Sequence, residues 1–445
     1  MNAKLAEVAG SVVAPRGFRA SGVFCDIKRL GTGKGSDKGQ KRDLALIVSN
    51  APATVAGLFT TNQICAAPVK VCLERVRKGS SQVVVINSGN ANACTGQQGM
   101  ADARTMARFT EQALKLPAGS ALVGSTGRIG VTMPMDNVRA GIIEAAVELG
   151  NSVAHASAAA EAIMTSDTRA KQIAVRFKLG GKTVHVGAIC KGAGMIQPGM
   201  SLTGKRPAAA GLHATMLCFV TTDAAIEAKA LRLALHEAVA QSFNRITVDG
   251  DMSTNDTVLV LANGLAGNAL IKARSSKLPP SARPFCAALN HVCLELAKMI
   301  VRDGEGVSRF VTVRLNGAKS PSDADAAARA VANSALVKTS WHGGDPNWGR
   351  IIDALGYSPA TIIEENVDIG YSAPCSKKVL WSLKRGQPTK AIFKQLCAAV
   401  APREFDLHIN LNLGRASALM YAADLTEEYV EFNKGDVSDP GSLGG

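Results

Sequence analysis

Aromatic residues and long apolar runs are scarce in this chain. Phenylalanine, tryptophan and tyrosine make up 4% of its 445 residues, so it has few of the stacking platforms that single-stranded nucleic acids require. No run reaches the roughly 18 apolar residues of a membrane-spanning helix. Residues 1–30 lack the charged, apolar and small-residue regions of a secretory signal. We therefore expect a cytoplasmic location and no contact with a membrane.

Metal and nucleotide motifs are also missing. The ten cysteines include no CxxC pair and the seven histidines no HExxH, so we expect reduced, mostly buried cysteines and no metal. Gly199–Lys205 has the spacing of a phosphate-binding loop, but Arg206 stands where Ser or Thr would bind Mg²⁺. Asp249–Ser253 resembles the start of a calcium loop, but Val260 replaces the Glu that closes such a loop. No cofactor is expected.

The chain carries a formal net charge of +14, which raises the question of nucleic-acid binding. No basic run is longer than Lys41–Arg42, and aromatic partners are few. These observations argue against nucleic acid. They favour a basic surface that attracts small substrates carrying carboxylates.

Short apolar runs rich in β-branched residues alternate with Ala-rich segments of helical periodicity, which predicts an α/β or α+β protein. Gly180–Gly181 separates two of the runs as a hairpin turn does. The expected strands are 44–48, 83–86, 175–177, 183–189, 219–221, 258–261, 310–315, 362–367 and 408–413. The expected helices are 101–116, 137–149, 154–164, 224–241 and 287–300.

Polar, Gly-rich segments interrupt these elements, and binding groups commonly lie on such loops. Each segment taken alone is more often a turn than a site. Together they resemble the ornithine acetyltransferase family (glutamate N-acetyltransferase, ArgJ type) over residues 17–433. The resemblance rests on the strings DLALIVSNAPATVAGLFTTNQICAAPV, VVINSGNANACTG, STGRIG, IMTSDT, CKGAGMIQPGM, ATMLCFVTTDAAI, NRITVDGDMSTNDT, VRDGEG and DPNWGRI.

The resemblance implies an α/β fold, a sandwich of two β layers flanked by helices, shared with related self-cleaving aminopeptidases. It implies that the precursor cuts itself between Ala214 and Thr215 into an α chain, 1–214, and a β chain, 215–445. Thr215 would then be the nucleophile, and Thr126 and Gly127 would form the oxyanion hole. The chains of such a protein would assemble as α2β2.

The resemblance also assigns substrate contacts. Ser438 stands where the family has a Thr, so it keeps the hydroxyl and loses the methyl group. Both Thr165 and Thr168 occur in MTSDT; the first is the expected contact and the second the alternative. The implied substrate contacts are Thr165, Lys191, Thr215, Glu305, Asn433 and Ser438.

The implied reaction moves the acetyl group of N2-acetyl-L-ornithine to L-glutamate through an acetyl-Thr215 ester, with acetyl-CoA as a possible second donor. A Thr hydroxyl needs a base, and a newly freed α-amine is one. The alternatives are a self-processed aminopeptidase or amidase, and a scaffold that binds without turnover. Ser201–His213 is an insertion before the cleaved bond, and its effect on cleavage is open.

Overall fold

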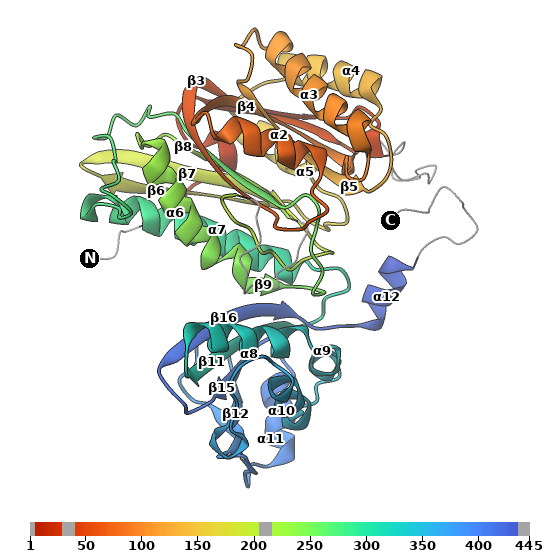
Figure 1. Cartoon of the computed structure of the whole chain (residues 1–445), viewed down its shortest axis with the longest axis vertical. Helices are drawn as coiled ribbons and strands as arrows, with labels where there is room; N and C mark the ends of the chain where they lie inside the picture. Colours follow the sequence, from red (N-terminus) through yellow and green to blue (C-terminus); the bar gives the residue numbers. More distant parts are fainter. Residues whose placement is uncertain (1–4, 29–40, 204–215, 435–445) are drawn as a thin grey trace. The chain divides into compact units, whose positions relative to one another are not determined.

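The computed structural model describes residues 5–28, 41–203 and 216–434, drawn in colour in Figure 1. The described chain divides into two compact units. The first takes the residues up to Asn244 together with Asp251–Ile300, and the second takes Arg245–Gly250 and Val301–Lys434. Each unit is built around one mixed β-sheet.

The first unit contains a nine-stranded sheet in the order β1-β6-β7-β8-β10-β3-β4-β5, with β2 paired to β3. The β8–β10 and β4–β5 pairs are parallel, and the other neighbours are antiparallel. The strands are β1 (Ala6–Glu7), β2 (Phe18–Val23), β3 (Leu44–Phe59), β4 (Ser80–Asn90), β5 (Ala121–Arg128), β6 (Lys171–Leu179), β7 (Lys182–Lys191), β8 (Leu217–Thr222) and β10 (Thr257–Ala262).

Strand β3 shows why this sheet is covered on both faces. Successive side chains of a strand point to opposite faces. Leu44 and Leu46 pack in one core cluster with Ile142 of α4, whereas Ala45 and Ile47 pack in another cluster. The second cluster includes alanines of α5 (Ala156, Ala159 and Ala160). A run that is apolar at every position therefore lies between two helical layers.

The helices of the first unit are α2 (Ala67–Val76), α3 (Gly96–Ala113), α4 (Met135–Val147), α5 (Val153–Ala162), α6 (Ala228–Ala240) and α7 (Arg283–Arg302), the last ending in the second unit. Short 3-10 turns are η1 (Ser11–Val13), η2 (Phe243–Arg245) and η3 (Pro280–Ala282). The five helices expected from the sequence are all present, with ends displaced by a few residues. The expected hairpin turn is confirmed, since Gly180 and Gly181 join β6 to β7 with φ of 55° and 80°.

Helix α7 lies in the one described stretch, Pro280–Arg302, that is long and apolar enough to cross a membrane by length and composition. Half of its apolar window is buried inside the protein. The buried side chains Phe285, Leu289, Val292 and Leu296 recur every three or four residues along one face. That periodicity is typical of a helix packed against a core.

The second unit contains a seven-stranded sheet in the order β14-β13-β12-β15-β11-β16-β9. Its strands are β9 (Ile246–Thr247), β11 (Phe310–Ala318), β12 (Asp368–Ser372), β13 (Leu380–Lys384), β14 (Gln387–Pro388), β15 (Glu404–Asn410) and β16 (Ala416–Ala423). Its helices are α8 (Pro321–Asn333), α9 (Ala335–His342), α10 (Trp348–Gly356), α11 (Phe393–Val400) and α12 (Glu427–Asn433), with a 3-10 turn η4 (Glu364–Asn366).

Helix α8 begins as its sequence dictates. Ser320 caps it by accepting a hydrogen bond from the Asp323 amide at 3.1 Å, and Pro321 occupies the first turn, where no amide hydrogen is needed. Its buried alanines pack with Val311 and Val313 of β11. The expected α/β class, with two β layers flanked by helices, is confirmed by the two mixed sheets.

One expected strand is wrong. Residues 362–367 form the 3-10 turn η4 and its flanks, and the strand β12 begins only at Asp368. The Ile362–Ile363 pair suggested a strand, but the next residues, Glu364 and Glu365, are exposed and belong to the turn. The strand expected at 408–413 is confirmed only in part, because β15 ends at Asn410.

Candidate active site

Strand β5 presents the predicted oxyanion pair at its carboxyl end. Thr126 is 1% exposed. Gly127 has φ of 129°, a backbone conformation that residues other than glycine rarely adopt. A Cβ at Gly127 would also lie 2.3 Å from the carbonyl carbon of Gly89 on β4. Only glycine therefore fits at this point of β5.

Lys191, the last residue of β7, lies against Thr126 of β5. Its side chain is buried, and its Nζ donates a hydrogen bond to Oγ1 of Thr126 at 3.3 Å. The structure thus brings together a predicted oxyanion donor and a predicted substrate contact that are 65 positions apart in the chain. A hydroxyl that accepts from an ammonium group still has its own hydrogen to donate.

Asp167 joins the turn of Thr165 to the end of β7. One carboxylate oxygen, Oδ1, accepts from Lys171 Nζ at 2.6 Å and from the Gly192 amide at 2.7 Å. The other, Oδ2, accepts from the amide of Thr165 at 3.0 Å. The side chains of Asp167 and Lys171 are 0% and 1% exposed, so this is a buried ion pair. Thr165 itself is exposed.

Charge decides the protonation state of Asp167. Burial by itself would raise the pKa of its carboxyl group. The ammonium groups of Lys191 and Lys171, together with the hydrogen bonds from Lys171 and Gly192, outweigh burial and lower the pKa to about 2. Asp167 is therefore an anion at any working pH.

A second buried acid lies where β10 begins. Asp256 is fully buried, and its Oδ1 accepts from the amide of Met216 at 2.5 Å. Burial raises the pKa of Asp256 well above its ordinary value, although Lys191 and the Met216 amide act against that shift. Its Oδ2 has no hydrogen-bond partner among the described residues.

The neighbouring Asn255 fixes two segments around the site. Its Nδ2 donates to the carbonyl of Ala91 at 2.7 Å and to the carbonyl of Ser125 at 2.8 Å. The segment after β4 and the end of β5 that carries Thr126 and Gly127 are thereby held at the start of β10. This side chain sets the position of Ser125, the residue before Thr126.

The predicted cleavage point, Ala214–Thr215, lies outside the described residues. Met216, which follows it, is the first described residue of the predicted β chain and is fully buried. Besides the bond to Asp256, its carbonyl accepts from the amide of Thr257 at 3.0 Å.

In the second unit, the structure brings together two further predicted contacts. Nδ2 of Asn433 donates to Oε2 of Glu305 at 3.0 Å and to the carbonyl of Tyr429 at 2.9 Å. Gly306 approaches α12 so closely that a Cβ there would lie 2.4 Å from the Tyr429 amide. Ser438 lies outside the described residues.

The profile of the ArgJ family matches residues 20–435. This chain belongs to the ArgJ family. It is 48% identical over 430 residues to the arginine biosynthesis bifunctional protein ArgJ of Symbiobacterium thermophilum, covering 96% of this chain and 98% of the relative. It is 41% identical over 432 residues to the glutamate N-acetyltransferase of Methanocaldococcus jannaschii, covering 95% and 98%.

Among solved structures, ornithine acetyltransferase complexed with ornithine from Mycobacterium tuberculosis is 36% identical to this chain. It matches with a TM-score of 0.40, covering 44% of this chain and all of that chain. ArgJ from Bacillus halodurans, also 36% identical, matches with a TM-score of 0.42 and covers 45% and 100%. The sequence-based expectation of the ArgJ family, and of an enzyme, is confirmed by the family match and the relatives.

Around this ArgJ-family site, no group of three or more His, Cys, Asp or Glu residues is placed to hold a metal ion within the described ranges. All ten cysteines are free thiols, as expected. Only half of them are buried, and Cys94 and Cys375 are exposed, so the expectation that most are buried was too strong.

Sequence reasoning missed four side chains of this ArgJ-family site: Asp167, Lys171, Asn255 and Asp256. Three of them lie inside the strings that carry the family resemblance, Asp167 in IMTSDT and the other two in NRITVDGDMSTNDT. Their place in these strings was the one available signal, but the sequence does not show that they are buried or which partners they find. Lys171 gave no signal, since a lone Lys at the start of a strand is usually exposed.

Proposed function

We propose that this protein transfers the acetyl group of N2-acetyl-L-ornithine to L-glutamate, through an acetyl ester on Thr215. Its relatives include an arginine biosynthesis bifunctional protein and a glutamate N-acetyltransferase, and these support the proposal. The observation that carries it is the contact between Lys191 and Thr126, which joins a buried cation to the predicted oxyanion donor.

In the first half of the proposed reaction, the Thr215 hydroxyl attacks the acetyl carbonyl while the α-amine freed by self-cleavage takes its proton. The negative charge that develops on the carbonyl oxygen needs hydrogen-bond donors already in place. The Thr126 hydroxyl and the Gly127 amide are the proposed donors. Ornithine leaves with the proton, and the acetyl group stays on Thr215.

In the second half, the amine of glutamate attacks the ester, a proton returns to the Thr215 oxygen, and N-acetylglutamate is released. Lys191 is the proposed partner of a substrate carboxylate, and Thr165 a further contact. Glu305 is the proposed partner of a substrate ammonium group, with Asn433 holding its carboxylate and Ser438 as a further contact. The reaction as written needs no metal and no bound cofactor.

The sheet of the first unit explains how the two predicted chains would remain together after self-cleavage. Strand β8 of the predicted β chain pairs with β7 of the predicted α chain, and β10 pairs with β3. Every residue of β8 is buried. Cutting at Ala214–Thr215 therefore leaves the two products paired in one sheet, and we propose that they assemble further as α2β2.

A donor and acceptor comparison tests the function. Purified protein is incubated with N-acetylornithine and glutamate, and the concentrations of N-acetylglutamate and ornithine are followed over time. The two products should appear in a 1:1 ratio. Acetyl-CoA replaces N-acetylornithine in a parallel reaction to test the second donor. Release of free acetate at the same rate with and without glutamate would instead identify an amidase, in which water resolves the ester.

A further inference from the structure

We propose that Asp167 is a positioning residue for substrate binding: it holds the Thr165 turn and the chain after Lys191 in the one arrangement that accepts the substrate carboxylate. The inference rests on the proposed function. It goes beyond it by assigning a role to the buried ion pair of Asp167 and Lys171, which the proposed reaction does not use.

The contacts of Asp167 reach both segments at once. Its Oδ2 accepts from the backbone of Thr165, and its Oδ1 accepts from the backbone of Gly192, the residue next to Lys191. Gly192 has φ of 147°, so the chain leaves β7 here in a conformation that glycine favours. A carboxylate that holds such a bend fixes where the preceding residue lies.

Lys171 explains how this anion persists in the interior. A buried charge is tolerated only when it is paired and hydrogen-bonded. Lys171 Nζ lies 2.6 Å from Asp167 Oδ1, and both backbone amides complete the coordination of the carboxylate. Asp167 carries one negative charge, and Lys171 and Lys191 carry one positive charge each, so the charges of these three groups sum to a positive value. A net positive charge beside Thr126 suits a substrate that arrives with a carboxylate.

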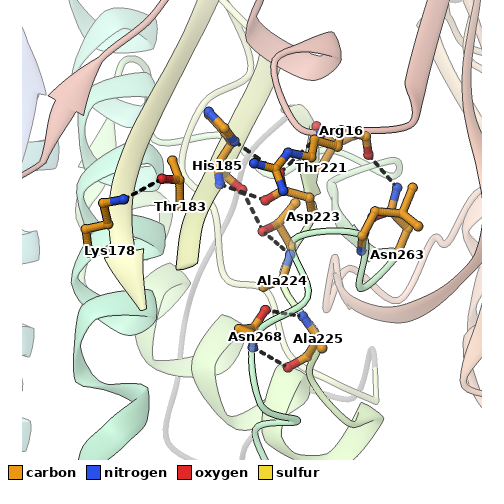
Figure 2. Close-up of polar contacts among 12 residues, drawn as sticks. Arg16, Lys178, Thr183, His185, Thr221, Asp223, Ala224, Ala225, Asn263 and Asn268 are labelled. Carbon is orange, nitrogen blue, oxygen red and sulfur yellow. Dashed lines mark hydrogen bonds and ion pairs between the residues drawn. The ribbon is translucent and has the colours of Figure 1, made fainter. Parts of the chain in front are cut away.

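The same unit offers a matched control. Asp223, which directly follows the last residue of β8, is also fully buried. Its carboxylate also accepts hydrogen bonds from two backbone amides, that of His185 at 2.7 Å and that of Arg16 at 3.3 Å. It also accepts from a ring nitrogen of His185, Nδ1, at 3.0 Å (Figure 2). Asp223 thus matches Asp167 in burial and in the kinds of its partners, but it contacts none of the predicted site residues in the described chain.

The experiment compares Asp167→Asn with Asp223→Asn in the self-processed full-length protein. For Asp167→Asn we expect KM for N-acetylornithine and for glutamate to rise roughly 10- to 100-fold, the scale of a misplaced binding group. For Asp223→Asn we expect both KM values to stay within about twofold of the unchanged protein. Thermal unfolding of both variants shows how far each change weakens the fold.

A neutral acyl donor separates positioning from damage. We expect the rate with p-nitrophenyl acetate, which has no carboxylate, to fall far less in Asp167→Asn than kcat/KM for the two amino acid substrates. Equal losses with all substrates, or equal KM effects in the two variants, would show that Asp167 is only structural and would overturn the proposal. A variant with unchanged KM would also overturn it. Failure of the proposed function is a separate result, because the unchanged protein would then make no N-acetylglutamate at all.

Should Asp167→Asn not fold, the double variant Asp167→Asn/Lys171→Met provides a second test. It removes the whole ion pair, and replacing a buried pair by neutral groups is often tolerated where breaking it is not. The proposal predicts that this variant folds, shows the raised KM for both amino acid substrates, and loses far less of its rate with p-nitrophenyl acetate than of its kcat/KM for those substrates. A folded double variant with normal KM values would refute it.

Discussion

Replacing Thr126 by Val tests the proposal that the Thr126 hydroxyl is an oxyanion donor. Val keeps the shape and volume of the side chain and removes only the hydroxyl. In the structure this hydroxyl is buried and accepts from Lys191 Nζ at 3.3 Å. Its loss removes one acceptor from a buried ammonium group, which generally costs about 1–3 kcal/mol. We expect a value near 1 kcal/mol, because the carboxylate of Asp167 also acts on Lys191.

The effect on catalysis should be larger than the effect on stability. Loss of one oxyanion donor typically lowers kcat by about 10²–10³-fold, equivalent to about 2.7–4 kcal/mol in the transition state. Steady-state assays with N-acetylornithine and glutamate should show this loss in kcat with KM nearly unchanged. Thr126→Ser, which keeps the hydroxyl, is the control and should retain most of the activity. A Thr126→Val protein with the kcat of the unchanged enzyme would refute the assignment.

Three further predictions address the fold and the processing. The carboxyl group of Asp167 has a pKa of about 2 in the folded state and about 3.9 when unfolded, so its ionised form contributes about 2 kcal/mol of stability above pH 4 that is lost as the pH falls towards 2. Denaturant unfolding across this range should show a smaller loss of stability in Asp167→Asn than in the unchanged protein. An equal loss in the two proteins would contradict the prediction. Asp256→Ala removes the acceptor of the buried Met216 amide and should destabilise the protein by about 1–3 kcal/mol in the same assay, with no change being the contrary result. Intact mass should show fragments 1–214 and 215–445 that separate on a denaturing gel and co-purify on a sizing column, whereas a fully active, uncut protein would exclude self-cleavage.

Apolar periodicity predicted the interior of the fold well and its irregular parts poorly. The run at 44–48 was expected as a short strand, yet β3 continues to Phe59 through Asn50, Ala51 and Pro52. The register between β3 and β4 shifts between Val48 and Ala53, so a bulge takes up the proline, which cannot donate to the sheet. Apolar periodicity alone does not predict that a strand continues after a bulge.

The edges of the second sheet were missed for a related reason. Strand β13 has two buried and three less buried positions in five, and β14 is two exposed residues. Strands so short and so weakly buried leave no two-residue alternation long enough to detect. Helix α8 was also missed, although Ser320 followed by Pro321 is a recognisable helix start.

The residues of the candidate site also fall into a predicted group and a group that only the structure revealed. Thr126, Gly127 and Lys191 were predicted because they lie in family strings, and the structure places Lys191 against Thr126. Asp167 and Asp256 were not predicted, because their significance lies in contacts with distant backbone amides that only the folded sheet creates. Local pattern predicted the candidate reacting groups, and tertiary structure shows which buried groups lie beside them.

The central claim is that Thr215 becomes acetylated during the reaction, and mass spectrometry of the predicted β chain tests it directly. Protein mixed with N-acetylornithine in the absence of glutamate should gain one acetyl group on its N-terminal peptide at Thr215, and adding glutamate should remove it. The kinetics should then be ping-pong, with parallel double-reciprocal lines. An unmodified peptide together with intersecting lines would show direct transfer between the two substrates and would contradict the account.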